Sequence, residues 1–226
     1  SESGIDIGSS NQFLDVGDIQ FEDDGENYWK IEEAVLQLVN KEAYVLFLGG
    51  DHSITYSIVK AFNTKYTKIN ILHFDAHPDL YNEFDGNPFS HACPFARIME
   101  NKLADNLIQV GIRAANRHQR EQADKFGVES IGLNVSAVEI CSKLEGPLYI
   151  TLDMDVLDPA FAPGISHHEP GGLSTRHVLD IIHGLDVPIV GADIVEYNPG
   201  RDINNVTAMT AAKFVKEIAA KIIENS

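Results

Sequence analysis

The sequence has little cysteine, few basic residues and no long apolar run. Its two cysteines, Cys93 and Cys141, lie far apart and form no CxxC pair, so a disulfide scaffold is excluded and a reducing compartment is expected. No stretch approaches the roughly 18 consecutive apolar residues that span a membrane. The opening SESGIDIGSS has neither a basic start nor an apolar core, so no signal peptide is expected. These absences favour a cytoplasmic location, with organelle targeting left open if a longer N-terminus carried such a segment.

The shortage of basic residues also restricts the partners. The chain carries 17 Lys and Arg against 34 Asp and Glu, which gives a formal net charge of −17. Because this charge repels phosphate backbones and acidic lipid head groups, we expect no binding to nucleic acid or to a membrane surface. An acidic balance suits a cationic substrate or bound metal cations, but it also arises simply from the need for a soluble surface.

Short apolar runs alternate with helical patterns from about Trp29 onward. The polar, Gly- and Asp-rich residues 1–27 predict an irregular lead-in. Apolar runs predict strands at 44–48, 69–74, 106–112, 128–132, 147–153 and 187–193. Helical patterns occur at 31–39, 53–63, 94–103, 116–126, 135–144, 174–185 and 204–224. Since no linker interrupts this alternation, the sequence predicts one α/β domain over 1–226, with a parallel sheet covered by helices on both faces.

Acidic and histidine side chains gather directly after four of the predicted strands. The segments are GGDHS (49–53), DAHPD (75–79), DMD (153–155) and the pair Asp193 and Glu196. In an open parallel sheet, ligands bind outside the carboxyl ends of the strands, so these loops are expected to converge at one edge. The alternation in DAHPD places its three polar side chains on one side of an extended segment.

Each segment alone has an ordinary explanation. His52 could be a core or helix-capping residue, Asp51 or Ser53 could cap the following helix, and the Asp-x-His-x-Asp triplet could be a solvated loop. Together the segments place four carboxylates and two imidazoles in one cleft, where like charges repel unless cations neutralise them. Such ligands suit hard or borderline divalent metals, and their number suits two ions about 3.5–4 Å apart that share carboxylates. The sequence therefore predicts a dinuclear metal site.

Four motifs carry a family resemblance. GGDHS, DAHPD, LDMDVLDPAFAPG and GADIVEYNP resemble the signatures of the ureohydrolases, which are the arginases, the agmatinases and their relatives. The resemblance extends from about Leu46 to the C-terminus, and the segments DAHPDLYNEFDGNPFSHACPFARIME and GISHHEPGGLS resemble plant-type arginases most. It implies a three-layer α/β/α sandwich with a mostly parallel sheet of about eight strands. The strand and Gly-rich loop with which ureohydrolases usually begin are missing, which is expected to weaken the sheet edge without removing a metal ligand.

The resemblance also implies a cofactor, two Mn²⁺ ions per subunit. The six ligands carry over to this sequence as His52, Asp75, Asp79, Asp153, His77 and Asp155. The first four would hold one ion. The last two would hold the other ion together with Asp75 and Asp153, which would bridge the pair.

Further residues carry over as parts of the active site. His91 lies where the family has a proton-shuttling histidine, and Glu196 lies where it has the carboxylate that binds the substrate guanidinium. Asn87, Ser90 and His167 are candidates for substrate contacts near the expected mouth of the site.

The other histidines have simpler expected roles. His73 lies inside a predicted strand and is expected to be a core residue. His118, His177 and His183 lie on predicted helices, where surface or packing positions are expected.

The activity implied by the resemblance is hydrolysis of a guanidino group by a metal-bridging hydroxide, with release of urea. The favoured reaction converts L-arginine to L-ornithine and urea. The alternatives are an agmatinase, which converts agmatine to putrescine and urea, a hydrolase of another guanidino compound, and an inactive metal-binding homologue with a regulatory role; a metal-dependent deacetylase of related fold is less favoured. The expected partners are a small cationic guanidino substrate and further copies of the chain, in a homotrimer or homohexamer.

Overall fold

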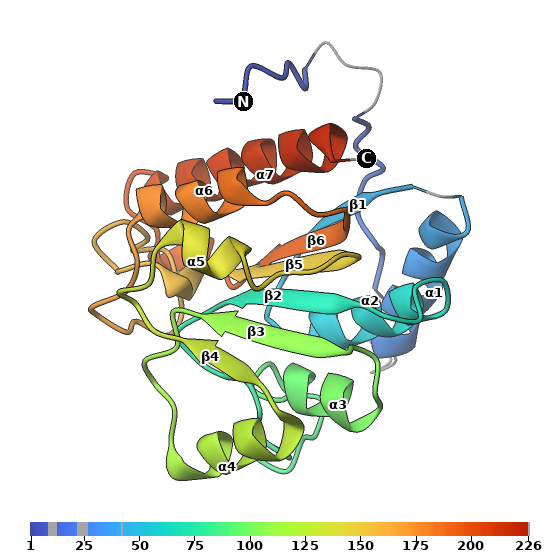
Figure 1. The fold of residues 1–226 in the computed structure, drawn as a ribbon, viewed down its shortest axis with the longest axis vertical. Helices are drawn as coiled ribbons and strands as arrows, with labels where there is room; N and C mark the ends of the chain where they lie inside the picture. The colour runs from blue at the N-terminus through green and yellow to red at the C-terminus, as the bar shows by residue number, and fades with distance from the viewer. Residues whose placement is uncertain (9–12, 22–26, 42, 226) are drawn as a thin grey trace.

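One parallel sheet forms the centre of the structure, in the strand order β1-β6-β5-β2-β3-β4 (Figure 1). The computed structural model describes residues 1–8, 13–21, 27–41 and 43–225. The strands are β1 (Val45–Leu48), β2 (Asn70–Phe74), β3 (Asn106–Val110), β4 (Glu129–Ile131), β5 (Leu148–Asp153) and β6 (Ile189–Val195). Every neighbouring pair runs parallel, so the carboxyl ends of all six strands meet at one edge.

Helices cover both faces of the sheet, as the sequence predicts, and give a three-layer α/β/α arrangement (Figure 1). The helices are α1 (Asn27–Val39), α2 (Ile54–Asn63), α3 (Pro94–Glu100), α4 (Arg117–Phe126), α5 (Ala137–Cys141), α6 (Thr175–Gly184) and α7 (Val206–Glu224). The first four lie on one face and the last three on the other. Two short 3-10 helices, η1 (Met154–Val156) and η2 (Pro199–Arg201), follow β5 and β6.

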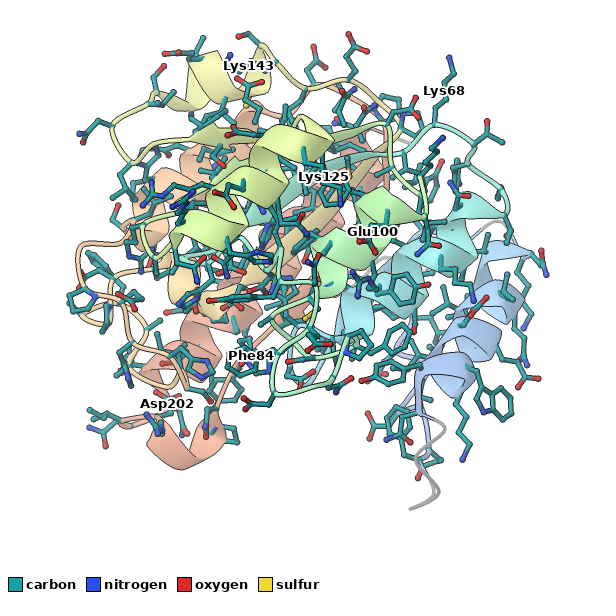
Figure 2. All side chains as sticks on the ribbon, turned by 90° about the horizontal axis from the view of Figure 1, so that it is seen from below. Lys68, Phe84, Glu100, Lys125, Lys143 and Asp202 are labelled. Carbon is teal, nitrogen blue, oxygen red and sulfur yellow. The ribbon has the colours of Figure 1, made fainter. Side chains whose placement is uncertain are left out.

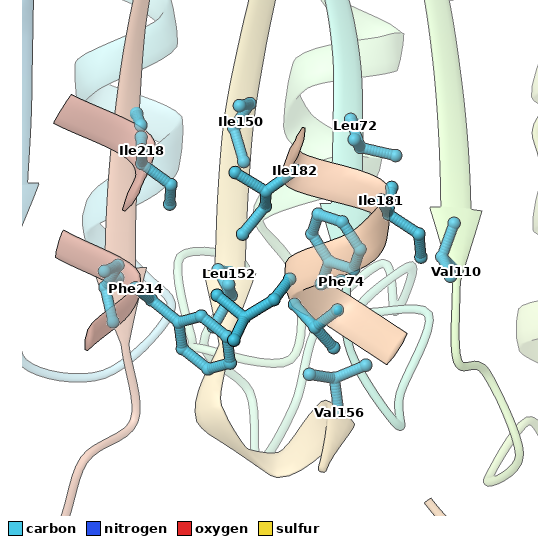
Figure 3. Close-up of a cluster of buried hydrophobic side chains, with 14 of the residues drawn as sticks. Leu72, Phe74, Val110, Ile150, Leu152, Val156, Ile181, Ile182, Phe214 and Ile218 are labelled. Atoms are coloured by element: carbon cyan, nitrogen blue, oxygen red, sulfur yellow. The ribbon is translucent and has the colours of Figure 1, made fainter. Parts of the chain in front are cut away.

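Two apolar layers hold the helices against the sheet. On one side, Ile71 and Tyr149 pack with α1, α2 and α3. On the other side, Leu72 and Phe74 pack with α5, α6 and α7, and Figure 3 shows Phe74 close to side chains of α6. All five residues of β2 are buried. This buried strand therefore contributes to both layers, because its successive side chains point to opposite faces.

The structure differs from the expectations in two respects that concern the site. Within the described residues the sheet has six strands instead of about eight, since residues 1–8 and 13–21 form no strand. The sixth strand also runs to Val195 and thus continues past Asp193, where it was expected to end. Two parts of the expected lead-in at 1–27, residues 9–12 and 22–26, lie outside the described residues. Within the described ranges, no helix is long and apolar enough to cross a membrane.

Candidate metal centre

The candidate ligands come from three loops at the carboxyl edge of the sheet. Phe74 of β2 pairs in register with Leu152 of β5, so Asp75 and Asp153, the next residues, stand side by side. His52 comes from the loop between β1 and α2. In Figure 2, Phe84 and Asp202 mark this end of the molecule. Lys68 and Lys143 mark the opposite end, where the strands begin.

His52 is the centre of a first ligand cluster. Its Nδ1 atom lies 3.1 Å from Asp75 Oδ2, 3.1 Å from Asp79 Oδ2 and 3.3 Å from Asp153 Oδ2. The side chain is wholly buried, yet Nδ1 makes no hydrogen bond with any described residue. Octahedral ions with bonds of about 2.1 Å place adjacent ligand atoms about 3.0 Å apart. The distance from His52 Nδ1 to each of the three oxygens is therefore that of adjacent ligand atoms around one cation.

His77 forms a second ligand cluster beside the first. Its Nδ1 atom lies 2.9 Å from Asp155 Oδ2 and 3.4 Å from Asp75 Oδ1. Ligand atoms of these three residues all lie within 4.8 Å of one another. Asp75 thus turns one oxygen toward each cluster, as a bridging carboxylate does. Asp153 turns Oδ2 toward His52, while its Oδ1 accepts the backbone N–H of Asp155 at 2.7 Å.

Burial and crowding give these carboxyls unusual proton affinities. Burial, with the charges of neighbouring carboxylates, raises the pKa of Asp153 well above its usual range. Burial and the charge of Asp75 raise the pKa of Asp79 to about 8 and that of Asp155 to about 6. Burial also acts to raise the pKa of Asp75, but its interactions with His52, His73 and His77 outweigh burial and lower this pKa well below its usual value. A divalent cation would relieve the repulsion by taking the place of the protons, so the donor set fits two such ions.

A buried polar row lies directly beneath the ligands. Gln109, His73, Thr151 and Asp193 occupy neighbouring register positions on β3, β2, β5 and β6, and all are fully buried. Thr151 Oγ1 lies 2.9 Å from His52 Nε2, the ring atom that faces away from the first cluster. Sequence reasoning missed this row; the available signal was a polar residue two positions before the ligand in both β2 and β5.

Asp193 does not join the ligand clusters. Its Oδ2 accepts hydrogen bonds from Tyr149 Oη at 2.8 Å and Thr55 Oγ1 at 2.9 Å. The expectation that it would lie in a ligand loop was wrong because β6 continues past it, which turns its side chain into the layer beneath the site.

Arg113 is a further residue that no sequence pattern indicated. Its guanidinium donates to the carbonyl of Asp155 at 2.7 Å and to the carbonyl of Glu169 at 2.6 and 2.9 Å. It also donates to the carbonyls of Gly111, Val156 and Leu157. The side chain thereby joins the loop after β3 to the loop that carries Asp155.

Glu196 stands next to the first cluster. Its Oε1 accepts the backbone N–H of His52 at 3.0 Å. The residue adopts a left-handed backbone with φ of 65°, as Asp79 does with φ of 49°. Such backbone strain in non-glycine residues is common at functional sites.

We define the mouth of the site as His91, His167 and Glu169, which contact one another or His77. The rings of His91 and His167 stack with centroids 5.5 Å apart and planes at 16°. His167 in turn contacts the ring of His77 edge-on at 6.2 Å, and Glu169 Oε1 lies 3.9 Å from His77 Nε2. The mouth therefore borders the second cluster.

The two other candidate substrate contacts lie in the loop that leads to His91. Asn87 uses its Oδ1 to accept the backbone N–H of Phe89 at 2.9 Å, which stabilises the turn before His91. Ser90 Oγ lies 3.4 Å from His91 Nδ1. The structure thus gives Asn87 a role in its own loop and brings Ser90 next to His91.

Comparisons with known families agree on one group. The family model described as the arginase family matches residues 2–220. Arginase 1, mitochondrial, from Arabidopsis thaliana is 45% identical over 98% of this chain and 70% of its own length. An agmatinase from Bacillus anthracis is 36% identical over 92% of this chain and 74% of its own length.

Solved structures extend this similarity to three dimensions. An arginase from Medicago truncatula matches with a TM-score of 0.83 and 47% identity. The match covers 89% of this chain, which spans 66% of that structure, just under two thirds. A proclavaminate amidino hydrolase from Streptomyces clavuligerus matches with a TM-score of 0.85 and 28% identity over 94% of this chain and 76% of its own.

Proposed function

Because the chain belongs to the arginase family, we propose that it hydrolyses the guanidino group of L-arginine to give urea and L-ornithine. The arginases and agmatinases of this family are hydrolases of amidine C–N bonds. The observation that carries the proposal is the convergence of His52 Nδ1 on three carboxylate oxygens at 3.1–3.3 Å, beside the carboxylate of Glu196.

Two Mn²⁺ ions are the proposed cofactor. His52, Asp75, Asp79 and Asp153 would hold one ion, and His77, Asp75, Asp153 and Asp155 the other. When bound, such a pair supplies a water nucleophile that is activated at neutral pH.

The remaining steps belong to side chains at the mouth. Glu196 accepts N–H groups of the planar guanidinium by charge-assisted hydrogen bonds and fixes the position of its carbon. His91 donates a proton to the amine that leaves. His167, stacked on His91, lines the path along which the substrate enters.

Arginine is preferred over agmatine as the substrate on two grounds. The plant arginases match this chain at 42–45% identity, whereas the agmatinases match at 36%. Arg201 of η2 donates to the carbonyl of Ser166, next to His167, at 3.2 Å. This places a cation near the mouth, where the α-carboxylate of arginine would be attracted and agmatine offers no such group.

The test is urea release by Mn²⁺-loaded protein from L-arginine and agmatine in parallel, with the metal content measured. Urea from arginine alone supports the proposal. Urea from agmatine alone keeps the reaction and replaces the substrate. Two bound ions with no urea from either would indicate another guanidino compound, and the absence of bound metal would favour an inactive homologue.

Assembly and location remain proposals. We propose a homotrimer or homohexamer, which light scattering on the purified chain tests directly. The cytoplasmic location also stays a prediction, since the names of the two Arabidopsis relatives place those proteins in mitochondria or chloroplasts.

A further inference from the structure

His73 lies directly beneath the candidate metal centre and uses both ring nitrogens. It is fully buried and stacks on Phe95 of α3, with ring centroids 3.9 Å apart. Its Nε2 atom lies 2.8 Å from Asp75 Oδ2. Its Nδ1 atom lies 3.0 Å from Nε2 of Gln109, the register neighbour on β3. The ring therefore connects the bridging candidate Asp75 with a neutral amide.

The surroundings of Gln109 fix the direction of these hydrogen bonds. Its Nε2 atom also lies 2.8 Å from the carbonyl oxygen of Pro78, which can only accept. Its Oε1 faces the hydroxyl of Ser130 at 3.4 Å, which can donate. The amide nitrogen therefore occupies the assigned position, with one N–H directed at Pro78 and the other at His73.

This direction determines the tautomer of His73. An amide nitrogen cannot accept, so Nδ1 of His73 carries a lone pair and the ring proton sits on Nε2. The Nε2–H group then donates to Asp75. His73 lies with His52 and Asp75 in a group that could hold an ion, but a protonated Nε2 cannot ligate one.

We propose that His73 is a positioning residue, held by Gln109 in the Nε2–H tautomer, which orients Asp75 so that one carboxylate oxygen faces each ligand cluster. The proposal rests on the metal centre of the proposed function. Groups that orient metal ligands in this way typically contribute about 10- to 100-fold to metal affinity. A pure core role, as the sequence suggested, predicts no effect on metal binding beyond a loss of stability.

The tautomer can be observed in the unaltered protein. Nitrogen-15 correlation spectra of histidine-labelled protein loaded with diamagnetic Mg²⁺ distinguish the two ring nitrogens. We expect His73 to carry its proton on Nε2 at neutral pH. A proton on Nδ1, or on both nitrogens, overturns the proposal whether or not the protein releases urea.

Two variants test the positioning role through Mn²⁺ binding. His73→Phe keeps a ring against Phe95 and removes the hydrogen bond, so we expect Mn²⁺ affinity to fall about 10- to 100-fold while two ions still bind at saturation. His73→Gln restores a donor and should recover most of that affinity. His177→Phe, on α6, is the matched control and should bind Mn²⁺ as the parent does.

Other outcomes of the Mn²⁺ titrations and the urea assay distinguish failure of this proposal from failure of the proposed function. Loss of one ion at saturating Mn²⁺ in His73→Phe would make His73 a ligand, and unchanged affinity would make it a core residue; either overturns the proposal. If the parent binds two ions but releases no urea, the proposed function fails while the metal titrations still decide the role of His73. If His73→Phe does not fold, His73→Gln and the tautomer spectrum decide it.

Discussion

The backbone N–H of His52 donates a hydrogen bond of 3.0 Å to Oε1 of Glu196. In the reverse direction, the backbone N–H of Glu196 donates to the carbonyl of Gly50 at 3.0 Å. These bonds fix the loop after β1 to the end of β6. Glu196, proposed to bind the guanidinium, is therefore held next to His52, a proposed metal ligand. The same two hydrogen bonds thus stabilise the substrate site and the metal site.

Glu196→Gln should separate these two roles. The amide oxygen can still accept from His52, so we expect the Mn²⁺ content to stay unchanged. Loss of the negative charge removes a charge-assisted hydrogen bond worth about 2 kcal/mol, and KM should rise about 30-fold. Urea assays with metal analysis check this. Loss of metal in this variant would show that Glu196 supports the metal site instead.

His91→Asn should lower kcat and leave metal binding intact. The imidazole stacks on His167 and is not among the candidate metal ligands. Removing a general acid typically costs about 10²- to 10⁴-fold in rate. Steady-state kinetics at saturating Mn²⁺ would measure this, with His118→Asn on α4 as the control. Unchanged kcat in His91→Asn would remove it from the mechanism.

Because there are two ligand clusters, substitutions of Asp75 and Asp155 should remove different numbers of bound ions. Asp75 faces both clusters, so Asp75→Asn should lose both ions. Asp155 faces only the second, and its amide variant can still accept the backbone N–H of Ala76 that Asp155 Oδ1 accepts at 2.9 Å. Asp155→Asn should therefore retain about one ion per chain. Mn²⁺ titration gives both numbers, and equal losses would contradict separate sites.

Arg113→Met should reduce stability more than a surface arginine does. The variant leaves the carbonyls of Asp155 and Glu169 without their donor, at a cost of about 2–3 kcal/mol. Arg120, which is exposed and donates to one carbonyl, is the control, and Arg120→Met should change stability by less than about 0.5 kcal/mol. Chemical denaturation of the two variants tests the difference. A similar loss in both would exclude a special role for Arg113.

The metal-free protein should lose stability as pH rises above neutral. Burial and the charge of Asp75 raise the pKa of Asp79 from 3.8 to about 8. Burial acts to lower the pKa of His77, but hydrogen bonds to Asp155 and Asp75 outweigh it and raise this pKa from 6.5 to about 11. The folded, metal-free protein thus binds more protons than the unfolded chain above neutral pH, so its stability falls as pH rises.

Mn²⁺ takes the place of those protons, so its stabilising effect should grow with pH. Each group contributes at most about 1.4 kcal/mol per pH unit. The measurement is the shift in Tm on adding Mn²⁺ at about pH 7 and about pH 8.5. A smaller shift at the higher pH would contradict the raised proton affinity of Asp79 and His77.

The sequence indicated most elements because their signals are local. The apolar runs at 44–48 and 69–74 correspond to β1 and β2, and their order with the helices gave the parallel sheet. The sequence misplaced the ends of some helices and strands, where the apolar pattern stops. The helix expected at 94–103 stops at Glu100, shortly before Lys102 takes a left-handed φ of 53°. The strand expected to end at 193 continues to Val195.

The sequence by itself determined which side chains are offered at the carboxyl edge, since the spacing of DAHPD and DMD is fixed along the chain. Only the tertiary structure decided how they meet. Pairing of β2 with β5 brings Asp75 beside Asp153, and the fold turns the two oxygens of Asp75 toward different histidines. The tautomer of His73 likewise depends on Gln109 of a neighbouring strand. Register between strands distant in sequence is set by the packing of the whole sheet, so no local pattern contains it.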